Sequence, residues 1–350
     1  MNPPYQADLP VALLAACFNK KATSYKFYWF LSIIQAVEAG QITISKKELF
    51  AGMIANAWYT INYFHVSFGV QDQLQRAIET LQEVEKLTID THQSAIQQQL
   101  VSTDNKISLK HLNYFNEQVP HWFLSPWFPK LGRAEIYEQS AIMANDCLYA
   151  LDKGHITINP KWHAYLYANS GILKNFCYWK LSLYLQSKNP NVPDIPNKLI
   201  KPALRNSLTK QRKRFWDIVV QELGGVSCIY TQKILLPGQY AVEHFVPYAF
   251  VSHDLIWNLI PADPTFNSSK SDRLPPLDRY FDPFFELQQT AIQITMDKSP
   301  NNQYLQDYLS IFPDLSIFQV DPPLSRQRFK DQLQPLITIA ANNGFEYLKL

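Results

Sequence analysis

The chain has 350 residues, of which 47% are hydrophobic, 14% aromatic and 18% charged, and its formal net charge is +2. This composition excludes an intrinsically disordered chain, because such chains combine low hydrophobicity with high net charge. The small net charge also excludes a dominant basic field, so any contact with nucleic acid must come from a local patch. Glycine is scarce, at 10 residues, which favours bulky, helix-rich packing.

The four cysteines, Cys17, Cys147, Cys177 and Cys228, are widely scattered and form no CxxC pair. This spacing argues against a zinc ribbon and against a secreted disulfide framework, and it predicts a reducing, cytoplasmic location. The segment SYKFYWFLSIIQAVEAG contains a lysine and a glutamate. It falls short of the roughly 20 apolar residues of a membrane-spanning helix, so no membrane segment is expected.

The first two hundred residues show mainly the periodicity of α-helices, with apolar residues three and four apart. Gly40 supplies a stop signal for the first strongly apolar helix. The predicted helices are 24–39, 46–63, 71–87, 90–101, 134–150 and 161–187.

Three other segments interrupt this helical pattern. Residues 120–132 hold three prolines and predict a packed loop, because proline breaks the regular hydrogen bonding of a helix. Residues 155–160 predict a short strand or extended turn. The stretch SKNPNVPDIPNK at 187–198 also holds three prolines and is the best candidate for a linker.

The predicted organisation is a mainly α-helical protein with a small mixed module near its centre. We expect a helical N-terminal domain at 1–197, with a role in docking, sensing or nucleic-acid binding. A basic helix and the central module follow at 198–277, and a C-terminal helical segment that packs on the core covers 278–350.

The central module contains polar residues that neither a core strand nor a core helix needs. Residues 227–247 predict two strands on either side of Pro237-Gly238, a turn signal, and place Glu243 and His244 near the end of the second strand. Pro264 suits the first turn of a following helix. Asn267 and Lys270 are three residues apart and therefore share one face of that helix.

This order of elements, together with Glu243-His244, Asn258, Asn267 and the terminal KSDRLP, resembles the HNH, or ββα-metal, nuclease module. Over 243–275 the sequence is similar, without a gap, to the HNH domain of the type II CRISPR effector nucleases. It also resembles bacterial HNH-domain proteins with a helical N-terminal region, often associated with anti-phage defence. KKATSYKFYWFLSII and NPKWHAYLYANSG look like that group too.

The resemblance implies a role for each of these residues in phosphodiester hydrolysis. His244 would accept the proton of the attacking water, since imidazole titrates near neutral pH. Glu243 and Asn267 would ligate one Mg²⁺ or Mn²⁺, because hard cations prefer carboxylate and amide oxygens. Asn258 would hold the loop that orients the histidine, and Lys270 and Arg273 would contact phosphate.

Two positions depart from the relatives, and three neighbouring residues have simpler interpretations. The CRISPR relatives carry an aspartate where this chain has Glu243, and many HNH enzymes use histidine where it has Asn267. His253 and Asp254 are interpreted as loop residues that cap a turn rather than as ligands. Cys228 is interpreted as a buried thiol, since no partner cysteines follow it.

A basic run precedes the module at 198–216. It has no acidic residue, and it could follow a phosphate backbone or be the solvated face of a helix whose Leu204, Leu208, Phe215 and Trp216 point inward. Its basic residues are Lys198, Lys201, Arg205, Lys210, Arg212, Lys213 and Arg214.

The sequence and its resemblance therefore predict a metal-dependent HNH endonuclease that acts on DNA. A role in bacterial defence is what the resemblance alone implies. Two alternatives remain open at this point. The chain could be a nucleic-acid-binding or scaffold subunit whose cleavage requires a partner such as an ATPase. It could also be an RNA nuclease, because HNH chemistry does not require a 2′-hydroxyl.

Overall fold

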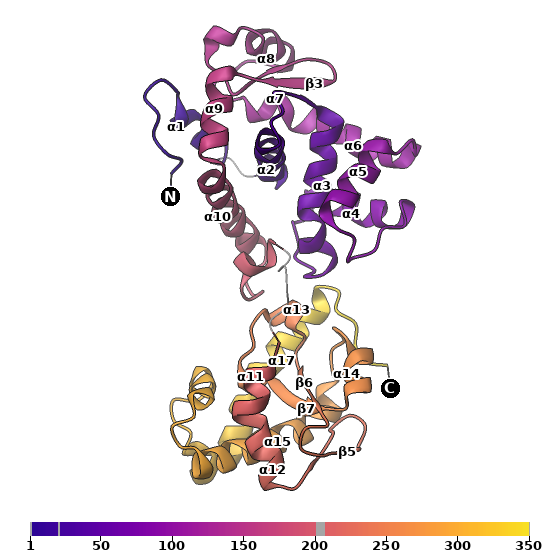
Figure 1. Cartoon of the computed structure of the whole chain (residues 1–350), viewed down its shortest axis with the longest axis vertical. Helices are drawn as coiled ribbons and strands as arrows, with labels where there is room; N and C mark the ends of the chain where they lie inside the picture. Colours follow the sequence, from indigo (N-terminus) through magenta and orange to yellow (C-terminus); the bar gives the residue numbers. More distant parts are fainter. Residues whose placement is uncertain (1, 20–21, 201–206, 350) are drawn as a thin grey trace. The chain divides into compact units, whose positions relative to one another are not determined.

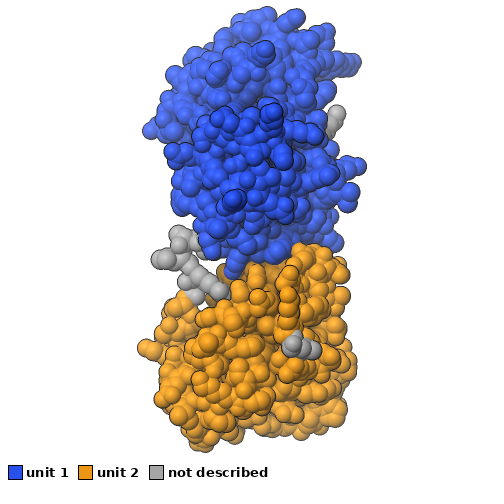
Figure 2. All heavy atoms as spheres, turned by 90° about the vertical axis from the view of Figure 1, so that its right-hand side faces the viewer, with its two compact units in different colours: residues 1–190, 195–201 blue, residues 191–194, 202–350 orange. Residues whose placement is uncertain are grey.

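The computed structural model describes residues 2–19, 22–200 and 207–349. The chain separates into two compact units, which Figure 2 distinguishes by colour. Unit 1 comprises Met1–Pro190 and Ile195–Lys201, and unit 2 comprises Asn191–Asp194 and Pro202–Leu350. Helices dominate both units (Figure 1), which confirms the mainly α-helical fold.

Unit 1 is built around α2 (Tyr25–Glu38), which lies among α3 (Lys46–Asn62), α9 (Pro160–Ala168) and α10 (Ser170–Lys188) in Figure 1. Eleven of the fourteen residues of α2 are buried. A helix that is apolar on nearly every side is stable only when other elements surround it, so the composition of α2 fixes its central place.

The remaining helices of unit 1 cover this centre. They are α1 (Val11–Ala16), α4 (Gln73–Val84), α5 (Gln93–Ser102), α6 (Lys106–Gln118), α7 (Pro120–Phe123) and α8 (Arg133–Ser140), with short 3₁₀ turns at Met143–Asn145 and Ile195–Lys198. A small antiparallel sheet has the order β1 (Thr43–Ser45), β3 (His155–Ile158), β2 (Tyr149–Leu151).

The structure differs from the predicted elements of unit 1 at several places. The helix expected at 134–150 ends at Ser140, because Tyr149–Leu151 pairs with β3 as a strand. The helix expected at 161–187 is divided at Asn169, which caps the junction of α9 and α10. Helix α6 was not predicted, and the proline-rich loop begins with the single turn of α7.

Unit 2 contains the predicted central module and the C-terminal helices. Its elements are α11 (Thr209–Gln211), a π-helical turn at Arg212–Trp216, α12 (Asp217–Glu222), β4 (Val226–Ser227), β5 (Ile234–Leu235), β6 (Ala241–His244), α13 (Tyr248–Val251), a 3₁₀ turn at Ile256–Asn258, β7 (Leu259–Ala262), α14 (Pro264–Lys270), α15 (Leu277–Lys298), a 3₁₀ helix at Gln303–Ser310, α16 (Ile317–Val320) and α17 (Pro322–Asn342).

The strand pairing of the module is not the one that the Pro237-Gly238 turn predicts. Strand β5 pairs with β4, whereas β6 pairs with β7 in antiparallel register, with Glu243 opposite Ile260 and His244 opposite Leu259. The expectation of strands on either side of the turn is met, but those two strands do not pair with each other. Strand β7 was missed because its residues LIPA include a proline, which cannot donate to the ladder.

Helix α15 packs against the β6–β7 hairpin. The Gln288 side chain, which is fully buried, donates a hydrogen bond to the backbone oxygen of Leu259 at 2.8 Å. The rings of Phe245 and Phe284 lie 4.0 Å apart between their centroids. The hairpin that carries Glu243 and His244 is thus held on a packed, rigid support.

No helix among the described residues is long and apolar enough to cross a membrane. All four cysteines are buried free thiols, as expected for Cys228.

Candidate active site

The last two residues of β6 place two ionisable side chains in the interior of unit 2. Glu243 is 3% exposed and His244 is 5% exposed. Burial of charged or titratable groups is unfavourable unless partners surround them, so their contacts determine what this place can do.

The Glu243 carboxylate is bound at both oxygens. Its Oε1 accepts a short hydrogen bond from the Tyr230 hydroxyl, and its Oε2 lies 3.0 Å from the Lys270 ammonium. Burial, reinforced by the Glu243 charge, raises the pKa of Tyr230 well above its usual value, so the phenol keeps its proton and remains a donor. Tyr230 is itself held by stacking on Phe266 of α14, with ring centroids 4.6 Å apart. Nothing in the sequence pattern identified Tyr230 as part of the site.

Lys270 joins the two residues of β6 from the end of α14. Its Nζ donates to the backbone oxygen of His244 at 2.8 Å, in addition to the ion pair with Glu243. The side chain is only 1% exposed. The sequence predicts that Lys270 contacts phosphate, whereas in this arrangement its ammonium reaches inward to a buried carboxylate.

His244 forms a pair with Asp254, which the sequence interpretation treated as a turn-capping residue. The His244 Nε2 and Asp254 Oδ1 atoms are 2.9 Å apart, and the Asp254 side chain is 21% exposed against 4% for His244. A carboxylate at this distance fixes the orientation of an imidazole and stabilises its protonated form. The pair could not be predicted from the sequence, because His244 and Asp254 are ten residues apart and meet only where the loop between β6 and β7 folds back through α13.

Asn258 fastens the loop at the point where the chain leaves β6. Its Oδ1 accepts from the backbone nitrogen of Val246 at 2.8 Å, and its Nδ2 donates to the backbone oxygen of Val246 at 2.8 Å. Its own backbone oxygen accepts from Phe245 at 2.8 Å. The side chain is fully buried, so Asn258 acts on the backbone that follows His244 rather than on a substrate.

Two further predicted site residues, Asn267 and Arg273, lie on α14 or just after it. Asn267 is half-buried, and its side chain makes no hydrogen bond with another described residue. Asp263 caps this helix and accepts from the backbone nitrogen of Thr265 at 2.9 Å. Arg273 is exposed, and its Nη1 donates to the backbone oxygen of Ser269 at 3.1 Å.

The described basic residues of the predicted run differ in exposure and in their contacts. Lys210, Lys213 and Arg214 are exposed, whereas Arg212 lies over the Tyr240 ring at 4.8 Å and its Nε is 3.6 Å from Asp217. Phe215 and Trp216 are buried, as expected for the inward side of a helix, and Leu208 is half-buried.

The first part of the run has a different place. Lys198 is buried within unit 1, where its ammonium lies 5.6 Å from the centre of the Phe64 ring. Lys201, Leu204 and Arg205 lie outside the described residues.

The predicted metal ligands fit a divalent cation in chemistry but not in their present arrangement. A carboxylate and an amide oxygen suit Mg²⁺ or Mn²⁺. However, the Glu243 oxygens are taken by Tyr230 and Lys270. Over residues 2–19, 22–200 and 207–349, no group of three or more His, Cys, Asp or Glu side chains could hold a metal. An ion that binds Glu243 would therefore compete with the Lys270 ammonium.

The hairpin β6–β7 followed by α14, with the histidine at the end of the first strand, defines a ββα module of the nuclease type. A family model described as HNH endonuclease matches residues 228–276. The chain is accordingly an HNH-domain protein, and the matched residues include every site residue of the hairpin and of α14. No curated protein and no solved structure matches the chain.

Proposed function

We propose that this protein is a divalent-metal-dependent endonuclease that hydrolyses DNA through residues 228–276. The observation that carries the proposal is the His244–Asp254 pair beside the buried Glu243 in a module of the HNH family. The family implies a nucleic-acid substrate and nuclease chemistry. Cytoplasmic location and a role in bacterial defence are proposed on the reduced cysteines and on the sequence resemblance alone.

In this proposal His244 is the general base. It takes a proton from water as the water oxygen bonds to phosphorus and the bond to the 3′ oxygen breaks. Asp254 stabilises the imidazolium that forms, and Asn258 holds the backbone beyond His244 in place. Mg²⁺ or Mn²⁺, when bound by Glu243 and Asn267, would offset the negative charge that develops on the phosphate.

Exposed basic residues of unit 2 are the proposed contacts to the phosphate backbone. Arg273 lies just beyond α14, and Lys210, Lys213 and Arg214 lie before α12, with Arg212 beside them. Such contacts make binding depend strongly on salt but carry no sequence information.

A second candidate is a subunit that cleaves only when a partner, such as an ATPase, acts on it. The burial of the site favours this candidate: Glu243 and Lys270 are 2% and 1% exposed in their side chains and are bound to each other. A substrate phosphate cannot reach such a pair without a rearrangement, which a partner could supply.

A cleavage assay separates these candidates. Purified protein is incubated with supercoiled DNA, linear DNA or RNA, in Mg²⁺, in Mn²⁺ or in EDTA. We expect nicking of supercoiled DNA that stops in EDTA. Binding of DNA without nicking in either metal would favour the partner-dependent subunit, and cleavage confined to RNA would reassign the substrate.

Replacement of Asp254 tests the assignment of His244 through its partner. Asp254→Asn keeps the size of the side chain but removes the charge that stabilises the imidazolium. We expect the cleavage rate to fall by about 10- to 100-fold while the melting temperature changes little, because Asp254 is partly exposed. The ¹⁵N chemical shifts of the His244 ring report whether its tautomer changes. An unchanged rate together with unchanged ring shifts would show that Asp254 has no influence on the base.

A further inference from the structure

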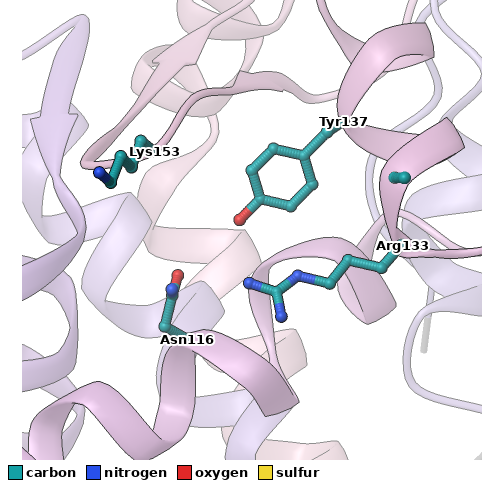
Figure 3. Close-up of a pocket in the computed structure, with 5 residues that line it drawn as sticks. Asn116, Arg133, Tyr137 and Lys153 are labelled. Carbon is teal, nitrogen blue, oxygen red and sulfur yellow. The ribbon is translucent and has the colours of Figure 1, made fainter.

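Unit 1 contains a pocket of about 370 Å³ that the nuclease proposal does not use. It is lined by Asn116 of α6, by Arg133, Ala134 and Tyr137 of α8, and by Lys153 of the turn between β2 and β3. In Figure 3 the Tyr137 hydroxyl, the Arg133 guanidinium and the Asn116 amide point toward the middle of the opening, and Lys153 lies at its edge. The volume lies within the range typical of small-ligand sites.

Cationic groups and hydrogen-bond donors surround this pocket, while most of its accessible lining is apolar. Lys46 contacts Tyr137 and is 3% exposed. Its ammonium donates a hydrogen bond to the Tyr137 hydroxyl at 2.7 Å and lies 4.7 Å from the centre of the Tyr137 ring. Lys46 also donates to the backbone oxygen of Asp152, and no carboxylate among the described residues forms an ion pair with this buried ammonium. Because Tyr137 accepts from Lys46, its own proton is directed to another acceptor.

Arg133 contributes further donors at the mouth of the pocket. Its Nη1 is bound to Glu117, and a guanidinium has five N–H donors, so the others remain for a ligand. Arg133 also lies over the Tyr137 ring, 5.8 Å from its centre. An arginine fork beside a hydroxyl and lysines is the usual arrangement for a phosphate group.

The same pocket contains an acceptor that lacks a donor. The Asn116 Oδ1 atom is buried and has no hydrogen-bond partner. The buried Nδ1 atom of His121 also has no hydrogen-bond partner, and the His121 ring lies 6.5 Å from the Tyr137 ring. Burial lowers the pKa of His121, and the nearby Lys46 lowers it further. A buried oxygen without a donor costs free energy, so it indicates a missing hydroxyl or amino group.

We propose that this pocket binds a mononucleotide, because the donors around it suit a phosphate and its mostly apolar lining and volume suit a nucleoside. The phosphate would contact Arg133, Tyr137 and Lys153, and a hydroxyl or amino group of the same molecule would donate to Asn116. The site lies within the N-terminal unit, so ligand binding there is independent of whether the HNH module cleaves DNA.

Isothermal titration calorimetry of the full-length protein tests the proposal. The probes are the four ribonucleoside 5′-monophosphates, inorganic phosphate and the four nucleosides. At least one monophosphate should bind with one-to-one stoichiometry and at least about 10-fold more tightly than phosphate or its own nucleoside, because only the intact nucleotide satisfies both halves of the pocket.

Three variants locate the binding. Arg133→Gln should weaken the nucleotide by at least about 10-fold and Tyr137→Phe by several-fold, since hydrogen bonds to a charged group are the strong ones. Lys110→Gln removes an exposed cation from the same helix as Asn116 but outside the pocket, and should leave the affinity unchanged. The proposal is overturned if no monophosphate binds, if Arg133→Gln and Tyr137→Phe bind as the unaltered protein does, or if a 5′-phosphorylated oligonucleotide binds as tightly as the mononucleotide.

Discussion

His244→Ala should reduce DNA cleavage by about 10²- to 10⁴-fold, which is the usual contribution of a general base. The imidazole is the only side chain at the end of β6 that can accept a proton near neutral pH while a carboxylate, Asp254, stabilises the resulting charge. The reaction is followed as conversion of supercoiled plasmid to the nicked form, under single-turnover conditions and at saturating metal.

The loss must be separated from unfolding, since His244 is buried and its removal leaves Asp254 without its partner. His244→Gln keeps an amide that can donate to Asp254 but supplies no base, so it should be as inactive as His244→Ala and closer to the unaltered protein in melting temperature. His155→Ala is the matched control, because it removes a histidine that also lies near an aspartate, Asp152, at 3.8 Å on the surface of unit 1. Cleavage at the normal rate by both His244 variants would remove the assigned base.

The buried α2 and the start of α14 were predictable from the sequence because they depend on local patterns, whereas α6, β7 and the strand pairing of the module were not. The burial of α2 follows from its aromatic and aliphatic residues, and the start of α14 follows from Asp263-Pro264, a capping residue before a proline at the first helical position. Glu243, His244, Asn258 and Asn267 could be selected as candidates because their polar side chains interrupt an otherwise apolar stretch.

The partners of these residues could not be predicted, because they depend on how the chain folds back. Asp254 reaches His244 only through the turn formed by α13. Tyr230 is 13 residues before Glu243, and the segment between them contains β5, which pairs with β4 rather than with β6. Lys270 shows the same difficulty. The sequence predicts that Lys270 contacts phosphate, whereas the packing of α14 on β6 directs the ammonium inward.

The Lys270–Glu243 ion pair leads to a second large effect, on stability and on metal binding. Lys270→Met removes the ammonium and leaves Glu243 as a buried carboxylate whose remaining partner is Tyr230. Removal of one partner from a buried ion pair costs about 3–5 kcal/mol. For a unit of this size that corresponds to a fall of roughly 10 °C in melting temperature in EDTA.

A divalent cation should reverse much of this loss, because the carboxylate is then open to an ion that the ammonium otherwise excludes. We expect Mn²⁺ to raise the melting temperature of Lys270→Met far more than that of the unaltered protein, and to bind the variant at least about 10-fold more tightly by calorimetry. Adding Glu243→Gln to Lys270→Met removes the proposed ligand charge and should abolish the response to Mn²⁺.

Lys298→Met is the matched control for loss of an ion pair from the same unit. Lys298 and Glu222 are 2.8 Å apart but about half exposed, so this change should cost less than about 1 kcal/mol and should not alter Mn²⁺ binding. If Mn²⁺ stabilised Lys270→Met no more than the unaltered protein, Lys270 would not compete with a metal for Glu243. The buried ion pair would then be a structural feature of the module, and the divalent cation would have to be sought at other oxygens.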